Sequence, residues 1–351
     1  MAELLDYLKR AVTDGASDLF IVAGSRISEK VEKQLIPISE ENVFPGETQR
    51  LISELYERAN RPIEKYRQGG NDDFSLSLPG LARFRVNTYH QRGSMAAVVR
   101  VVVFDIPDWR ELHIPQQIMD LSKETRGLVL VSGPAGSGKS TTQACVLEQI
   151  NATRACHIIT LEDPIEFLYR NRKSIISQTE IGIDAEDYLS ALRCCMRQAP
   201  DVILLGELRE NEIIRTAMTA AETGRLVFAT MQTHGVLNTI ERIVDIFPAG
   251  QQEQIRLQLS NVLHTVISQQ LLPGTDKELV PAYEIMRVNN GIRTLIRENK
   301  SQQIDNAIAV GDEGMISMEH CLLSLYQQGK ITKETALEHA YYPEKLLRRL
   351  G

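Results

Sequence analysis

The chain has 351 residues, of which 43% are hydrophobic and 24% charged, a balance typical of a folded globular protein and not of a disordered one. The net charge of -7 argues against a protein that binds nucleic acid through bulk electrostatics, so we expect no nucleic-acid partner. The apolar runs 95–99 and 101–104 are far shorter than the roughly 18 residues that span a bilayer. The acidic, amphipathic N-terminus does not resemble a signal peptide, which predicts a cytoplasmic protein. Five cysteines without a C-x-x-C pair predict reduced thiols and no zinc.

The first hundred residues alternate short helical and strand-like patterns. The spacing predicts helices over 4–12 and 48–59 and strands over 18–23, 74–78, 82–87 and 96–104. We therefore expect an α+β domain over 1–105, with the last three strands in an antiparallel sheet. Residues 106–118 contain two prolines and little periodicity, which predicts a linker. If the two domains close over a bound nucleotide, this linker near Pro107 to Pro115 is the expected hinge.

The remaining part, residues 119–351, has the alternation of an α/β domain. Strands are predicted at 128–132, 157–161, 202–205 and 226–230, and helices at 139–150, 185–197 and 211–223. Strands alternating with helices predict a parallel sheet. From Leu237 onward we expect mostly helices, with breaks at Pro248, Pro273–Gly274 and 311–314.

Residues 133–140, Gly-Pro-Ala-Gly-Ser-Gly-Lys-Ser, fit the phosphate-binding pattern G-x-x-x-x-G-K-[S/T]. A predicted strand precedes them and a predicted helix follows, so backbone N–H groups and a helix N-terminus would face phosphates. Lys139 would reach the β- and γ-phosphates, and the Ser140 hydroxyl would ligate Mg²⁺. The alternative is an ordinary glycine-rich turn. The predicted ATP-binding residues of this loop are Gly133, Pro134, Ala135, Gly136, Ser137, Gly138, Lys139, Ser140 and Thr141.

Acidic residues follow two of the predicted strands. Glu162, Asp163 and Glu166 come after strand 157–161, and Glu207 comes after strand 202–205. The carboxyl ends of parallel strands are where such a sheet places its ligand, so these groups are candidates for activating water and for contacting a metal ion. A solvated acidic turn and a helix cap are the alternatives.

In this order the stretches GPAGSGKST, TLEDPIE and VILLGELRE resemble the Walker A motif, the aspartate box and the Walker B motif of the GspE/PilT family. These are the secretion-type ATPases of type IV pilus and type II secretion systems. Residues 15–19 and 82–87 are also similar to family strands, so the resemblance covers nearly the whole chain. It implies a small PAS-like N-terminal domain, a RecA-like phosphate-loop ATPase domain with a helical C-terminal part, and ATP with Mg²⁺ as cofactors.

The resemblance also implies roles for individual residues. Glu166 falls on the glutamate regarded as the catalytic base and Glu207 on the Walker B glutamate, while Lys139 belongs to the same catalytic set. Arg85 and Arg100 match arginines that reach the phosphates when adjacent domains close, an arginine-finger arrangement. Solvated strand residues are the alternative for both. The implied Mg²⁺ site is Ser140, with Glu162, Asp163 and Glu207 nearby.

Residues 291–298, Gly-Ile-Arg-Thr-Leu-Ile-Arg-Glu, resemble the helix that marks the PilT-like retraction branch. The tetracysteine zinc module usual in assembly and secretion relatives is missing from the sequence. This resemblance implies a hexameric ring that retracts a type IV pilus in twitching motility. It also implies contact with an inner-membrane pilus platform protein, so that the ATPase works at the cytoplasmic side of the membrane. The predicted partner motif is Ile292, Arg293, Leu295, Ile296 and Arg297.

The sequence departs from the family pattern at two positions. Gln232 stands where the family has a histidine, and glutamine donates and accepts hydrogen bonds but takes no proton near neutral pH. Gln232 and His234 are the candidate phosphate sensors, and the alternative for His234 is a surface histidine. Phe20 replaces a second histidine, as in the accessory PilU-like ATPases. These departures keep a weakly hydrolysing accessory subunit open. A DNA-packaging motor and a phosphate-loop kinase are further alternatives for a protein with this loop.

Overall fold

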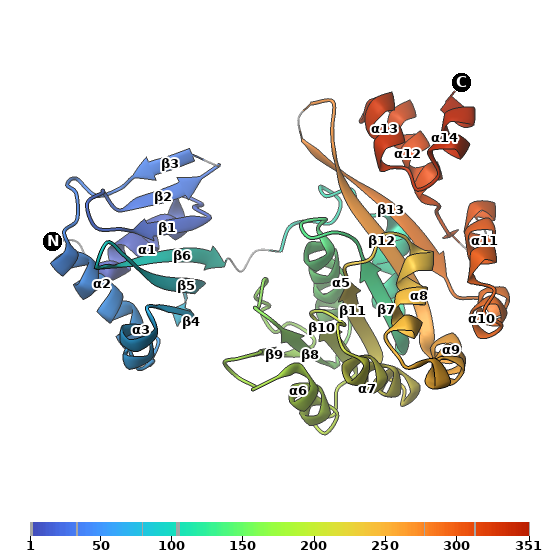
Figure 1. Cartoon of the computed structure of the whole chain (residues 1–351), viewed down its shortest axis with the longest axis horizontal. Helices are drawn as coiled ribbons and strands as arrows, with labels where there is room; N and C mark the ends of the chain where they lie inside the picture. Colours follow the sequence, from blue (N-terminus) through green and yellow to red (C-terminus); the bar gives the residue numbers. More distant parts are fainter. Residues whose placement is uncertain are drawn as a thin grey trace. The chain divides into compact units, whose positions relative to one another are not determined.

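The computed structural model describes residues 3–32, 34–78, 80–102, 106–276, 278–311 and 314–350. The chain divides into two compact units, residues 1–105 with 166–168, and residues 106–165 with 169–351 (Figure 1). Ile106, Trp109 and Leu112 of the predicted linker pack against the core of the second unit. No helix in the described part of the chain combines the length and apolar composition that crossing a bilayer requires.

The first unit is an antiparallel sheet with helices on one face. The strands occur in the order β3-β2-β1-β6-β5-β4. Alternate strand residues such as Leu19, Phe84, Val86 and Val99 are fully buried against the helices, as the period of two predicts. The predicted antiparallel strands are confirmed, except that 103–104 lie outside the described residues. The elements are α1 (Leu4–Thr13), β1 (Asp18–Ile21), β2 (Ser28–Val31), β3 (Gln34–Pro37), α2 (Pro45–Arg58), α3 (Glu64–Gly69), β4 (Asn71–Leu78), β5 (Ala82–Gln91) and β6 (Ser94–Val102).

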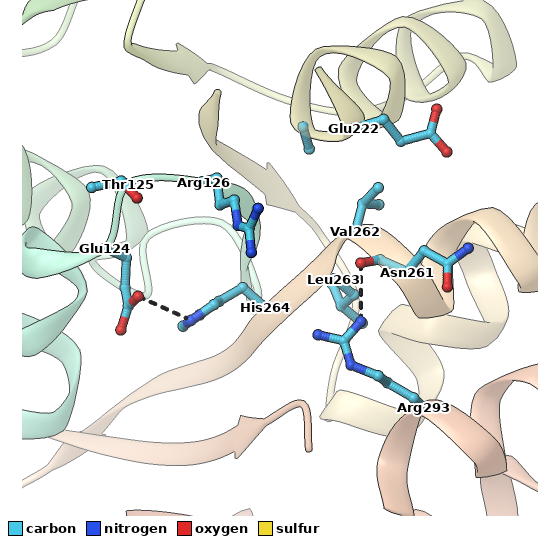
Figure 2. A pocket seen from close by; sticks show the side chains of 11 residues that line it. Glu124, Thr125, Arg126, Glu222, Asn261, Val262, Leu263, His264 and Arg293 are labelled. Atoms are coloured by element: carbon cyan, nitrogen blue, oxygen red, sulfur yellow. Dashed lines mark hydrogen bonds and ion pairs between the residues drawn. The ribbon is translucent and has the colours of Figure 1, made fainter. Parts of the chain in front are cut away.

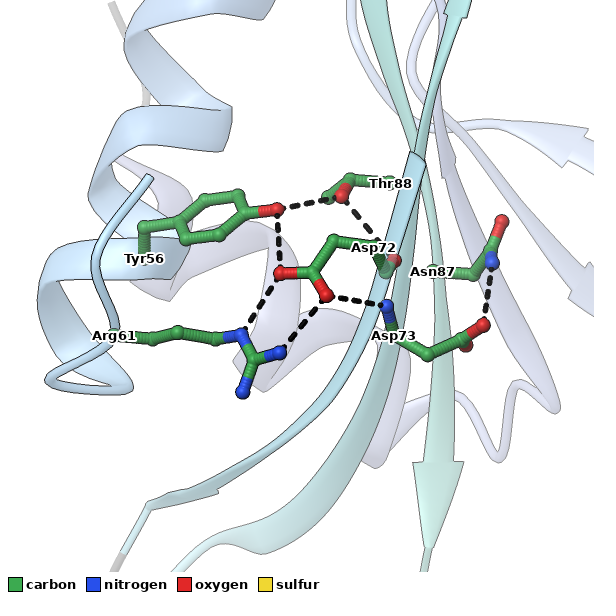
Figure 3. A network of polar contacts seen from close by, with 6 residues as sticks. All are labelled: Tyr56, Arg61, Asp72, Asp73, Asn87 and Thr88. Carbon is green, nitrogen blue, oxygen red and sulfur yellow. Dashed lines mark hydrogen bonds and ion pairs between the residues drawn. The ribbon is translucent and has the colours of Figure 1, made fainter. Parts of the chain in front are cut away.

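A buried polar network ties the sheet of the first unit to the segment after α2 (Figure 3). Arg61 makes two 2.8 Å hydrogen bonds to the carboxylate of Asp72 through Nε and Nη2. The Tyr56 hydroxyl lies 3.3 Å from the same carboxylate and 2.8 Å from the Thr88 hydroxyl. Burial raises the pKa of Tyr56 to about 12, so this hydroxyl keeps its proton and can donate. The network satisfies a carboxylate that water scarcely reaches.

The second unit has a seven-stranded sheet in the order β13-β12-β7-β11-β10-β8-β9. All neighbouring strands from β12 to β9 are parallel, and β13 alone is antiparallel to its neighbour. Strands β7, β10 and β11 are buried along their whole length, which explains their continuous apolar sequences. The strands are β7 (Gly127–Ser132), β8 (His157–Glu162), β9 (Ile175–Glu180), β10 (Val202–Leu205), β11 (Leu226–Met231), β12 (Leu263–Pro273) and β13 (Leu279–Arg287).

Helices cover both faces of this sheet. One face packs against α6 to α11 and the other against α4, α5 and residues 106–114. A separate small core joins the ends of β12 and β13 to α12, α13 and α14 (Figure 1). The helices are α4 (Gln116–Met119), α5 (Lys139–Thr153), α6 (Tyr188–Cys195), α7 (Asn211–Glu222), α8 (Val236–Asp245), α9 (Ala249–Val262), α10 (Asn290–Arg297), α11 (Ile304–Val310), α12 (Met318–Gln327), α13 (Lys333–His339) and α14 (Pro343–Leu350), with 3₁₀ turns at Asp120–Lys123 and Ser301–Gln303.

The expectation of a mostly helical region after Leu237 was wrong for residues 263–287. This stretch forms the long strands β12 and β13, and Pro273–Gly274 ends β12 at their connection instead of breaking a helix. Strand β9 was also not expected. The polar residues Ser268, Gln269, Gln270 and Glu284 interrupt the apolar pattern of β12 and β13, yet all four are buried. Periodicity alone does not reveal a strand whose buried positions include polar side chains.

Candidate nucleotide site

The phosphate loop connects β7 to α5 and has the geometry that its glycines predict. Gly136 and Gly138 have φ values of +77° and +84°, a left-handed conformation that favours glycine. Helix α5 begins at Lys139, so its N-terminus lies at the end of the loop. Lys139 Nζ donates to the carbonyl oxygens of Gly133 at 2.8 Å and Pro134 at 2.7 Å. The lysine ammonium therefore lies over the loop that would hold phosphates.

Gln269 of β12 supports this loop from below, a role that the sequence did not reveal. Its side chain is buried, and its Oε1 accepts a 2.8 Å hydrogen bond from the Thr142 hydroxyl of α5. A Cβ added to Gly138 would lie 2.9 Å from Gln269 Nε2, and one added to Gly133 would lie 2.2 Å from the Gln269 carbonyl oxygen. Gly133 therefore faces the backbone of β12, whereas at Gly138 the left-handed φ and the Gln269 side chain favour glycine.

Three predicted acidic residues gather around Tyr188 of α6. Burial raises the pKa of the Tyr188 hydroxyl above its usual range, and the nearby charges of Asp163, Glu162 and Glu207 raise it further. Glu162 ends β8 and Glu207 follows β10, the strand beside β8, so the parallel register brings them to one edge of the sheet. Carboxylate and hydroxyl oxygens are the ligands that Mg²⁺ prefers, and this edge offers them together with Ser140. The donor set fits a Mg²⁺–nucleotide complex.

Gly206, which precedes Glu207, packs against the hydroxyl end of the Tyr188 side chain. A Cβ at this position would lie 2.4 Å from the Tyr188 hydroxyl oxygen. We expect Gly206→Ala to displace Glu207 and lower kcat about tenfold, since overpacking costs about 1–3 kcal/mol. Adding Tyr188→Phe removes the clashing oxygen and should restore most of the activity. Steady-state ATPase measurements on the single and double variants test this, and a double variant as impaired as Gly206→Ala would contradict it.

The two candidate sensors lie in different places. Gln232 follows β11, which lies between β7 and β10, and its Nε2 donates to Glu207 Oε2 at 3.1 Å. Arg209 donates to the same oxygen at 2.6 Å. His234 instead lines a cavity of about 200 Å³ with Glu284, Asp305 and two tyrosines. The structure therefore joins Gln232 to Glu207 and does not bring His234 to it.

The other predicted catalytic residues are Glu166 and Arg100, which are exposed, and Arg85, which is half-buried. Glu166 is exposed in the segment that follows β8. Arg85 and Arg100 are directly opposite each other on β5 and β6. Arg100 Nε lies 3.0 Å from Asp18 Oδ1, and Arg85 Nε lies 3.9 Å from Asp73 Oδ1. The strand register thus turns two arginines fifteen positions apart into one cationic pair, with a carboxylate beside each member.

The predicted partner motif lies in α10, and two of its five residues are in the core. Ile292 and Ile296 are 1% and 0% exposed, which corrects the prediction that they contact a partner, because a partner cannot reach them. Leu295 is partly buried beside them, whereas Arg297 is exposed. Arg293 Nη1 donates to the carbonyl oxygens of Ser260 and Asn261, near the end of α9. Most of the motif therefore packs α10 against the rest of the second unit, and Arg297 is its exposed basic residue.

Arg293 also lines a cavity of about 700 Å³ (Figure 2). Gly127 at the start of β7 and Leu263 at the start of β12 line the same cavity. The phosphate loop follows the opposite end of β7, so the cavity and the nucleotide site lie at opposite edges of the sheet. Glu124, which lines the cavity, has its Oε2 3.4 Å from His264 Nε2 and its Oε1 3.0 Å from Arg287 Nη2.

Sequence reasoning missed Gln269, Tyr188 and Arg209. Arg209 lies only two residues after Glu207, and this proximity to a predicted acidic residue was the signal that could have identified it. No local pattern marks Gln269 or Tyr188, since both meet the site only through the fold.

The fold and the site define a phosphate-loop nucleotide-binding protein: a mostly parallel sheet between helices, with the loop after β7 and acids after the neighbouring strands. The sequence profile of the family described as "Type II/IV secretion system protein" matches residues 2–345. The chain belongs to this family. It is accordingly an ATPase.

Individual relatives match along almost the full length. The chain is 40% identical over 344 residues to the type IV pilus retraction ATPase PilT of Pseudomonas aeruginosa, covering 97% of this chain and 99% of PilT. It is 34% identical over 335 residues to the type IV pilus ATPase PilU of the same organism, covering 95% of this chain and 87% of PilU. A crystal structure of the retraction motor PilT with bound ADP superimposes with a TM-score of 0.91, at 41% identity and with 99% and 100% of the two chains covered.

Proposed function

We propose that this ATPase drives the retraction of a type IV pilus, as PilT does. The observation that carries the proposal is the likeness to PilT over 97% of the chain, in sequence and in fold. The identity to PilU is lower, at 34%, so the retraction motor itself is favoured over the accessory subunit. The phosphate loop and the acids after β8 and β10 supply the chemistry that such a motor needs.

The same likeness supports the domain organisation that we propose. Residues 1–105 are a PAS-like domain, 106–118 a linker, and 119–351 a RecA-like ATPase domain with helices at its C-terminal end. The chain works as a hexameric ring at the cytoplasmic face of the membrane, where it engages the platform protein of the pilus. Arg297, the exposed member of the α10 motif, is the candidate contact for that partner.

Each site residue has a task in ATP hydrolysis. The loop 133–138 and the first turn of α5 bind the phosphates, and Lys139 balances their charge. Ser140, with Glu207 and with Glu162 and Asp163 nearby, would hold Mg²⁺, which supplies charge neutralisation on the phosphate oxygens. Glu166 orients the attacking water and takes its proton. Arg85 and Arg100 stabilise the charge that develops on the γ-phosphate.

Gln232 keeps the hydrogen-bonding part of the family histidine's role. Its amide donates to Glu207, so it fixes the carboxylate without carrying a proton. A histidine in this position would change charge near pH 6.5, whereas an amide does not. The rate of hydrolysis therefore does not depend on the protonation of a side chain at position 232, as it would with a histidine there.

The enzymatic part of the proposal is tested with purified protein and Mg·ATP. We expect Glu166→Gln to lower kcat about a hundredfold or more with little change in ATP affinity, because general-base catalysis contributes about 10²–10⁴-fold. Glu186→Gln, which replaces an exposed glutamate near α6, is the matched control. A wild type as inactive as Glu166→Gln would favour the accessory subunit over the motor.

The cellular part is tested by deletion of the gene. A strain without this protein should lose surface motility and carry surplus pili, because pili would be assembled but not withdrawn. Complementation with the wild-type gene should restore retraction, and complementation with Glu166→Gln should not. Normal retraction in the deletion strain would contradict the proposed function.

A further inference from the structure

Residues 232–235 connect β11 to α8 and include both candidate sensors, and we call this segment the sensor loop. Its first residue donates to Glu207 at 3.1 Å, as described above. Just before the loop, the Thr230 carbonyl accepts from Leu208 N at 2.9 Å, and the Thr230 hydroxyl donates to the Gly206 carbonyl. The start of the sensor loop is therefore joined to both sides of Glu207.

The other end of the sensor loop is held by buried side chains of β12 and β13. Glu284 is only 5% exposed, and its Oε2 accepts a 2.7 Å hydrogen bond from Val236 N, the first residue of α8. Ser268 Oγ accepts from Gly235 N at 2.9 Å. The consecutive backbone N–H groups of Gly235 and Val236 thus donate to two buried side chains, and these bonds fix the N-terminus of α8.

Gly235, at the end of the sensor loop, packs beside Tyr341 and Glu284. Gly235 has φ of +82°, and a Cβ there would lie 3.4 Å from the Tyr341 ring and 3.7 Å from Glu284 Oε2. The Tyr341 hydroxyl lies 2.9 Å from Ser268 Oγ. Tyr341 belongs to the segment between α13 and α14, so the C-terminal helices cover the clamp formed by Glu284 and Ser268.

Burial also decides the state of the Glu284 carboxyl. Burial raises its pKa to about 8, the bond from Val236 N opposes the rise, and the charges of Asp305 and Glu319 add to it. At pH 7 the protonated acid therefore predominates. Glutamine has the same shape as this neutral form and keeps the carbonyl oxygen that accepts from Val236 N.

We propose that Glu284 is a positioning residue for ATP hydrolysis, which holds the sensor loop so that Gln232 reaches Glu207. Its hydrogen bond is with Val236 N and not with Glu207, and it acts through the three residues of the sensor loop, 233–235, that separate Val236 from Gln232. The proposal rests on the ATPase activity and not on the pilus. It gives the C-terminal helices a route to the Walker B glutamate, through Tyr341 and Ser268.

A double-mutant cycle tests the proposal with the full-length protein. Gln232→Ala and Glu284→Ala should each lower kcat about tenfold, and KM for ATP should change less than about twofold. Because both changes remove the same contact to Glu207, the double variant should be no slower than the slower single variant. Glu284→Gln should retain nearly wild-type kcat. Glu278→Ala, an exposed glutamate just before β13, is the control.

The outcomes separate the possible failures. Losses that multiply to about a hundredfold in the double variant would overturn the proposal, because independent sites behave in this way. An equal loss in Glu284→Gln would overturn it too. If Glu284→Ala does not fold, Ser268→Ala replaces it in the same cycle with the same expected non-additivity. A wild type without ATPase activity would instead contradict the proposed function.

Discussion

Gly133→Ala is expected to weaken ATP binding about a hundredfold, because backbone strain and a clash add to about 3 kcal/mol. Gly133 has φ of +143°, a conformation that is nearly confined to glycine. Its added Cβ would lie 2.2 Å from the Gln269 carbonyl oxygen and 2.7 Å from Ser137 Oγ. Since β12 is paired with β7 and β13 on its two sides, Gln269 cannot withdraw, and the phosphate loop must shift instead.

Gly136→Ala is the matched control for this experiment. Gly136 has φ of +77°, but among the described residues none beyond its two chain neighbours has an atom within 4 Å of the added Cβ. Only the left-handed backbone opposes alanine there, at about 1–2 kcal/mol, so we expect about a tenfold loss of affinity. Titration with a fluorescent ATP analogue measures both, and thermal unfolding shows whether each variant remains folded. Equal affinities of Gly133→Ala and the wild type would contradict the steric account of the loop.

The phosphate loop could be predicted from the sequence because its determinants are local. The glycines, Lys139 and Ser140 are contiguous, and the strand and helix that make them a site adjoin them. Gln269 could not be predicted, since it meets Thr142 across 127 positions and only the sheet order brings them together. The pairing of Arg85 with Arg100 lies between these cases, because the two strands were predicted but their register was not.

The polar residues of β12 and β13 explain why these strands were missed. Ser268, Gln269 and Glu284 are buried, yet each uses its side chain to hold a backbone amide or a hydroxyl of the nucleotide side of the domain. A strand that supports loops needs polar groups among its buried positions, and these weaken the hydrophobic pattern by which a strand is predicted. The same residues that obscured the fold therefore organise the site.

Asp72→Ala is expected to destabilise the first unit by about 3–5 kcal/mol, the usual cost of removing one partner from a buried ion pair. The Asp72 side chain is 1% exposed and Arg61 is 27% exposed, so the guanidinium would lose two 2.8 Å bonds without full access to water. The Tyr56 hydroxyl would lose an acceptor as well. The single tryptophan, Trp109, packs in the second unit, so its fluorescence does not report this change. Hydrogen exchange of peptides from β4 and β5 across a urea series measures it directly.

The neighbouring carboxylate supplies the control, and it distinguishes burial from charge. Asp73 is 57% exposed, accepts from Asn87 Nδ2 at 3.1 Å and lies 3.9 Å from Arg85. An exposed ion pair contributes about 0–1 kcal/mol, so Asp73→Ala should leave the exchange of the same peptides almost unchanged. Both variants remove one negative charge from the same strand. Only Asp72 is shielded from water, so the buried network predicts a much larger effect for Asp72→Ala than for Asp73→Ala. Equal destabilisation of the first unit by the two variants would contradict this prediction and would point to the loss of negative charge as the cause.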